Sequence, residues 1–184
     1  KGKRVAIEKS PSRIWIHLNS VFMSKNILSR IEKPKTNNLK YYIDKNLLMK
    51  LIILSGDYKI IRNVKLRSGK ILEDSKESKI ENYDISWYEN LFNNAKDVFE
   101  FSIREHGSIL RYVQYATMYL IKNVINENVN SKNKHILASE KLDKFYEKLK
   151  DILQNIDNKI IMNTLGNKLV NFYLLRLKCD LLDK

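Results

Sequence analysis

Cysteine, glycine and proline are scarce in this chain of 184 residues, which contains one Cys, five Gly and two Pro. The single cysteine excludes an intrachain disulfide and a zinc site built from cysteines, and it favours an intracellular location, cytoplasmic or nuclear. So few glycines and prolines argue against a loop-rich β-sandwich and against a glycine-lined phosphate loop. Because 43% of the residues are hydrophobic, the chain is expected to be globular.

Membrane-spanning and catalytic signatures are also missing. The longest apolar stretch, Ile109 to Ile125, is interrupted by Arg111, Gln114 and Lys122 and is too short to cross a bilayer. The sequence contains no Gly-x-Ser-x-Gly elbow, and its three histidines are far apart with no second histidine four residues on. We therefore expect no transmembrane segment, no metal site and no cofactor, and a protein that is more simply explained as non-catalytic.

One enzymatic alternative stays open, a metal-dependent nuclease. Nucleases hold a divalent ion with two acidic groups and a lysine, and Glu77 and Lys79 with Asp57 or Asp74 resemble such a set. Glu77 and Lys79 fall in a polar segment, however, and not on the apolar strand that would fix their geometry.

The chain opens on Lys1 and Gly2 instead of Met, so we also expect a piece of a longer protein.

Positive charge is concentrated at the beginning of the chain. Residues 1–70 contain 17 Lys and Arg against 4 Asp and Glu, whereas residues 71–184 contain 17 of each. The net charge of +13 thus arises entirely within the first 70 residues, which an even bias toward lysine does not explain. The asymmetry predicts a basic region over 1–72, a polar linker over 73–84 and a helical region over 85–184.

Side-chain periodicity predicts a small amount of β-structure and two short helices in the basic region. Alternation favours a strand from Arg13 to Leu18 and a hairpin from Tyr58 to Leu72 that turns at Ser68 and Gly69 and has one basic face. Helical spacing favours helices over residues 20–31 and 44–55, the second ended by Gly56. Two helices followed by a basic hairpin are compatible with a winged-helix arrangement.

From Asp84 onward the pattern is helical, and it predicts a four-helix bundle in a mainly α protein. The first helix starts at Ser86, and the second, Ile109 to Ile125, is apolar on nearly every side and is expected at the centre. A polar loop over 126–133 precedes the third helix. The last is expected to run from Lys159 to Leu182, bent at Gly166, and to bury an apolar face made of Ile161, Leu165, Leu169, Phe172, Leu175 and Cys179.

Basic side chains interleaved with aromatic ones in the first 70 residues predict a non-catalytic nucleic-acid-binding protein that contacts the phosphate backbone of DNA or RNA. Stacking of an aromatic ring on a base contributes about 1 to 3 kcal/mol. The predicted interface comprises Lys3, Arg4, Arg13, Trp15, Lys25, Arg30, Lys33, Lys35, Lys40, Tyr41, Tyr42, Tyr58, Lys59, Arg62, Lys65, Arg67 and Lys70.

The helical region is expected to dock a protein partner. The main alternative function is therefore a helical scaffold, a fragment of a larger assembly that binds acidic proteins. An oligonucleotide distinguishes the two functions. Nucleic-acid binding predicts an affinity that falls steeply as salt is added, because phosphate binding releases counterions.

Overall fold

The structure is a computed structural model that describes residues 3–14, 24–31, 43–60, 85–130 and 140–180. Helices dominate these residues, and the strands form a small antiparallel ribbon, so the prediction of a mainly α protein with a small α+β region at its start is confirmed. In chain order the elements are β1 (Lys3–Ala6), α1 (Lys25–Leu28), α2 (Ile43–Ser55), β2 (Asp57–Ile60), α3 (Ile85–His106), α4 (Arg111–Asn130), α5 (Glu140–Gln154), α6 (Asn158–Asn163) and α7 (Lys168–Lys178).

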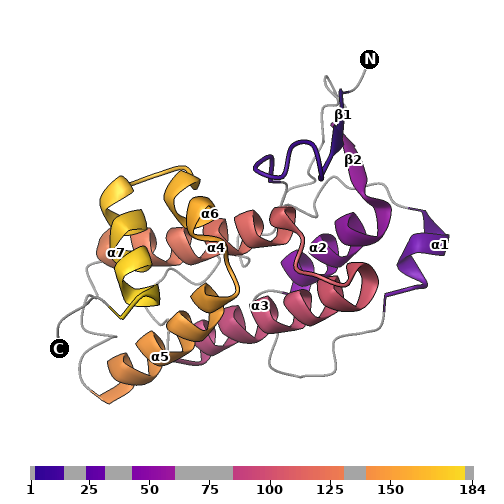
Figure 1. Ribbon diagram of the computed structural model, residues 1–184. Helices are drawn as coiled ribbons and strands as arrows, with labels where there is room; N and C mark the ends of the chain where they lie inside the picture. The colour runs from indigo at the N-terminus through magenta and orange to yellow at the C-terminus, as the bar shows by residue number, and fades with distance from the viewer. Residues whose placement is uncertain (1–2, 15–23, 32–42, 61–84, 131–139, 181–184) are drawn as a thin grey trace, which may run out of the picture.

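The elements are distributed along a body whose length is spanned by α3 (Figure 1). The ribbon, α1 and α2 lie at one end, and α5, α6 and α7 lie at the other. The basic beginning of the chain and its last helices are therefore separated in space. The predicted linker over 73–84 lies outside the residues described.

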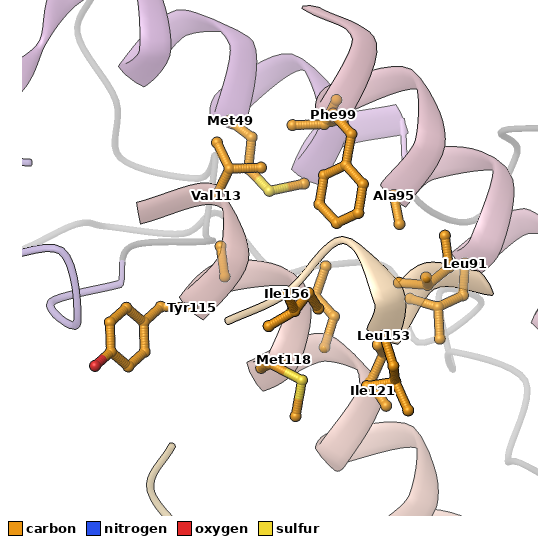
Figure 2. Packing of buried hydrophobic residues seen from close by; sticks show 14 of the residues in the cluster. Met49, Leu91, Ala95, Phe99, Val113, Tyr115, Met118, Ile121, Leu153 and Ile156 are labelled. Atoms are coloured by element: carbon orange, nitrogen blue, oxygen red, sulfur yellow. The ribbon is translucent and has the colours of Figure 1, made fainter. Parts of the chain in front are cut away.

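Helix α4 occupies the centre of the core, as its apolar pattern predicts. Tyr112, Val113, Ala116, Met118 and Ile121 are all buried within it. All five belong to one hydrophobic cluster with residues from α2, α3 and α5, and Figure 2 shows Val113, Met118 and Ile121 within it. Helix α2 contributes to this cluster and is mostly buried.

The described residues do not test the winged-helix interpretation, which stays a prediction.

The helix end predicted at Gly56 is confirmed, and both it and the end of α3 carry a glycine in the left-handed region of backbone conformation. Gly56 has φ +70° and follows α2, and Gly107 has φ +75° and follows α3. Such a conformation suits glycine because a Cβ atom would be strained there. At the corner between α3 and α4, Ser102 Oγ donates to the carbonyl of Ser108 at 2.9 Å and accepts from the amide of Leu110 at 2.9 Å.

Three predicted boundaries are wrong. Residues 126–130, expected as loop, continue α4. The first helix of the basic region spans only Lys25–Leu28 within residues 24–31, and Arg13 and Ile14, expected at the start of a strand, have no strand conformation. The strand that does form there is β1, which pairs with β2 across more than fifty residues of sequence. Val5 and Ile7 are both buried and are two residues apart. This alternation of apolar residues is the feature of the sequence that indicates the strand.

The last predicted helix is two helices. Thr164 ends α6, Asn167 caps α7, and Gly166 between them has φ +115°, so the chain breaks where only a bend was expected. The side chain of Asn167 accepts from the amide of Leu169, which satisfies one of the free N–H groups at the start of α7.

The predicted apolar face of the last helix is only partly buried, because Ile161 is buried and Leu175 packs against the core, whereas the other four residues face outward. Leu165 is 87% exposed, Leu169 77% and Phe172 54%, and Cys179 is exposed as well. The residues that α7 buries are Asn171, Leu174 and Leu177. A polar residue thus forms part of the buried face.

Candidate nucleic-acid interface

The ribbon of β1 and β2 has one inward and one outward face. Its register pairs Arg4 with Lys59 and Val5 with Tyr58. Paired residues of an antiparallel ribbon project from the same face, and consecutive residues project from opposite faces. Because Val5 is buried, Tyr58 faces inward, and Arg4 and Lys59 share the outer face. Lys59 is exposed between half-buried neighbours, as the alternation in this segment predicts.

Asp57 neutralises part of this outer face. The Nε atom of Arg4 donates to Oδ2 of Asp57 at 2.7 Å, and Nη2 of Arg4 contacts the same oxygen. The hydrogen bond and the negative charge of Asp57 raise the pKa of Arg4. The outer face therefore carries two cations and one carboxylate.

This pair also bears on the nuclease alternative. The carboxylate of Asp57 is engaged by a guanidinium, and the residues described contain no group of three or more potential metal ligands. Asp74, Glu77 and Lys79 lie outside these residues.

Residues 7–14 fold back onto the ribbon through backbone hydrogen bonds. The amide of Ile7 donates to the carbonyl of Gly56 at 3.1 Å, and the amide of Arg13 donates to the carbonyl of Ser10 at 3.1 Å. The hydroxyl of Tyr58 then donates to the carbonyl of Arg13 at 2.8 Å. Burial raises the pKa of Tyr58, and the positive charge of Arg13 opposes that rise. The Tyr58 hydroxyl thus attaches the backbone of Arg13 to the ribbon. Stacking of the Tyr58 ring on a base stays a prediction.

The remaining predicted cations near the start of the chain fall into two groups. Lys3, Arg13 and Lys59 lie at the ribbon, and no carboxylate within the described ranges forms an ion pair with them. Lys9 belongs to the same loop as Arg13, is exposed and also has no such partner in those ranges. At a distance from the ribbon, α1 carries Lys25, and Arg30 after it pairs with Glu105 of α3 at 3.4 Å.

The other predicted interface residues are outside the part of the chain that the structure describes. They are Trp15, Lys33, Lys35, Lys40, Tyr41, Tyr42, Arg62, Lys65, Arg67 and Lys70.

Among the described basic residues at the start of the chain, Lys50 is buried and contributes nothing to a surface. Lys50 of α2 has its Nζ atom 2.5 Å from Oδ2 of Asp97 on α3 and 5.4 Å from the centre of the Phe101 ring. Asn46 donates to the same Asp97 oxygen at 2.6 Å. This cluster joins α2 to α3. Lys50 is therefore not available to contact a polyanion.

A second candidate surface lies at α7. Apolar spacing in the sequence does not reveal this surface, because it predicts that these residues belong to the core. This surface combines the exposed Leu165, Leu169 and Phe172 with Lys168. Tyr173 lies beside them, and burial together with a hydrogen bond to Tyr146 raises the pKa of Tyr173 to about 12.

Comparison with protein-family models, curated proteins and solved structures finds no match for this chain. None of the helices within the described residues has the length and apolar character needed to cross a membrane.

Proposed function

We propose that this protein binds DNA or RNA through the phosphate backbone, without chemistry, using the basic region at the start of the chain. The observation that carries the proposal is the position of Lys3, Lys9, Arg13 and Lys59 around the ribbon, with no carboxylate partner in the described residues. An intracellular site of action, which the single cysteine favours, is consistent with such a partner.

The geometry favours recognition of charge over recognition of sequence. Cations on a short ribbon and its adjoining loop contact phosphates, whereas base reading needs an element that enters a groove. Helix α2 is poorly suited to that role, because much of its surface is buried against the core. If four cations each neutralise one phosphate of duplex DNA, the logarithm of affinity falls against the logarithm of salt with a slope of about −3.6.

Fluorescence polarisation with a labelled random oligonucleotide, single- and double-stranded, at several salt concentrations tests the proposal. The variant Arg13→Glu/Lys59→Glu should bind at least tenfold more weakly, and its salt slope should be smaller by about two. The matched control is Lys144→Glu/Lys159→Glu, which makes a comparable charge change at exposed lysines of α5 and α6, at the opposite end of the molecule. No binding at low salt, or an equal loss in both variants, rejects the proposal.

We further propose that the helical region docks a protein partner. The observation that favours this second function is the exposed apolar face of α7, because apolar side chains that share one helix face are normally covered.

A further inference from the structure

Arg13 is an exposed arginine whose backbone is fixed on both sides. Its amide donates to the carbonyl of Ser10 at 3.1 Å, and its carbonyl accepts from the hydroxyl of Tyr58 at 2.8 Å. The residue that follows, Ile14, packs against the hydrophobic core. The loop of residues 7–14 therefore holds the backbone of Arg13 beside the ribbon and leaves its side chain exposed to solvent (Figure 1).

The turn before Arg13 makes this arrangement more rigid. The hydrogen bond from Arg13 to Ser10 closes a β-turn in which Pro11 is the second residue, and the proline ring presets the φ angle that this position requires. The amide of Ser10 donates to the carbonyl of Ala6 at 3.0 Å, which joins the turn to the end of β1. Because the backbone is already ordered, little of its entropy is lost when Arg13 meets a ligand.

Arg13 differs from the other cations at the ribbon in availability and in chemistry. Arg4 forms an ion pair with Asp57, whereas Arg13 forms none with any carboxylate of the described ranges. The lysines at the ribbon carry ammonium groups, which are compact and strongly hydrated. A guanidinium is planar and more weakly hydrated, so it enters a confined site at a lower desolvation cost. Arg13 is therefore the ribbon cation best suited to a narrow groove.

The grooves of nucleic acids differ in how well they admit such a side chain. The minor groove of A·T tracts in duplex DNA is narrow, and its enhanced negative potential attracts inserted arginines. Guanine places an amino donor in the minor groove, and arginine, which has only donors, cannot pair with it. The minor groove of double-stranded RNA is wide and shallow. An exposed arginine on an ordered backbone therefore matches the minor groove of A·T tracts.

We propose that Arg13 enters the minor groove of duplex DNA and gives the protein a preference for A·T tracts. The inference rests on the nucleic-acid binding proposed above and names the class of nucleic acid. Lys9 lies in the same loop, and Lys59 is next to Tyr58 in β2, so these lysines supply cations for the phosphates that border the groove. The preference arises from groove width and potential and requires no pattern of base contacts.

Fluorescence polarisation with the full chain and labelled duplexes of equal length tests the inference. The probes are an A·T tract, a G·C duplex, an inosine·cytosine duplex and double-stranded RNA. Inosine lacks the amino group that guanine presents in the minor groove, but it has the same major-groove edge as guanine. At one salt concentration, the A·T and inosine duplexes should bind about fivefold more tightly than the G·C duplex or the RNA.

Three variants separate groove recognition from charge. Arg13→Lys keeps the charge, so it should bind the G·C duplex as the unchanged protein does, with the preference for A·T reduced to about twofold or less. The matched control is Arg4→Lys, which makes the same substitution at the arginine paired with Asp57 and should keep the full preference. Glu8→Gln removes an exposed carboxylate from the loop and should strengthen binding to all probes by the same factor.

The inference is overturned by equal binding of the A·T and G·C duplexes, by an inosine duplex that binds as weakly as the G·C duplex, or by tighter binding of RNA. It is also overturned if Arg13→Lys keeps the full preference or loses no more of it than Arg4→Lys. In each of these cases the protein still binds nucleic acid, and the proposed function stands. Absence of binding to every probe at low salt rejects the proposed function itself. Circular dichroism verifies that the variants fold.

Discussion

The Nζ atom of Lys122 on α4 lies 2.6 Å from Oδ1 of Asn171 on α7. It also donates to the carbonyls of Leu165 at 2.7 Å and Thr164 at 3.2 Å, so three acceptors surround the ammonium group of a residue that is 2% exposed. Burial lowers the pKa of Lys122. The acceptors include carbonyls at the end of α6, where the helix dipole favours a cation. Lys122 therefore holds α6, α7 and the turn between them against the central helix.

Replacement of Lys122 by methionine should destabilise the protein. Lys122→Met keeps much of the volume but leaves the buried Asn171 Oδ1 without its donor and removes one of the two donors to the carbonyl of Thr164; an unsatisfied buried acceptor costs about 1 to 3 kcal/mol. Urea unfolding followed by circular dichroism measures the change. Lys159→Met, at an exposed position of α6, is the control and should change stability by no more than about 0.5 kcal/mol. Equal effects would contradict the role assigned to Lys122.

Substitution of Gly166 should be costly for a reason that involves the same lysine. A Cβ atom at Gly166, where φ is +115°, would lie 3.0 Å from Lys122 Nζ, whereas at Gly56, with φ +70°, it would meet nothing within 4 Å. Backbone strain alone costs about 1 to 3 kcal/mol at such positions. Gly166→Ala should therefore destabilise more than Gly56→Ala, and the difference should shrink when Lys122 is truncated to alanine. Additive effects of Gly166→Ala and Lys122→Ala would exclude this coupling.

The orientation of α7 shows where sequence periodicity stops being informative. Apolar spacing predicts Leu165, Leu169 and Phe172 as the buried face, and it correctly identifies α4 as central because nearly all of its sides are apolar. The setting of α7 depends instead on Asn171 and Lys122, which are 49 residues apart. Nothing local to either residue predicts that a polar pair forms the contact.

Long-range pairing limits the prediction of the candidate interface in the same way. The uneven distribution of charge is visible in the sequence, and it directs attention to the residues that surround the ribbon. Arg4 and Arg30, however, are partly neutralised by Asp57 and Glu105, at separations of 53 and 75 residues. A count of charges along the chain overestimates the cations offered to a polyanion, because folding brings carboxylates from elsewhere.

The ion pair between the buried Lys50 and the partly exposed Asp97 provides a third stability test. Asp97→Ala would leave Lys50, whose side chain is 6% exposed, without its carboxylate; because the Asp97 side chain is 37% exposed, the expected loss is about 1 to 3 kcal/mol, below that of a fully buried pair. Lys50→Met/Asp97→Ala should recover most of that loss, because no uncompensated charge stays buried. Glu105→Ala, which breaks the exposed contact with Arg30, is the control and should cost about 1 kcal/mol or less. A double variant less stable than Asp97→Ala would disprove this explanation.

Tyr173 should make the protein less stable in alkali. Its pKa is raised to about 12 from 10.0 by burial and by its contact with Tyr146. Between these two pH values the unfolded chain has lost a proton that the folded protein retains, so the free energy of unfolding falls as the pH rises. Tyr173→Phe should reduce this decline, measured by urea unfolding across the same pH range. Tyr146→Phe should lower the pKa of Tyr173 in an ultraviolet absorbance titration, and an unchanged titration would rule out the assignment.

Removal of the charge on Asp57 should strengthen the binding of oligonucleotides. Asp57→Asn releases Arg4 from its ion pair, so one more cation on the outer face of the ribbon becomes available to a phosphate. The salt slope should then steepen by about 0.9, the value for one additional phosphate contact on duplex DNA. Asp151→Asn makes the same change in net charge on α5, where the carboxylate lies 3.9 Å from Lys96, and it should leave the slope unchanged. If both variants steepen the slope equally, net charge and not the ribbon governs binding; if neither does, Arg4 does not reach the phosphates.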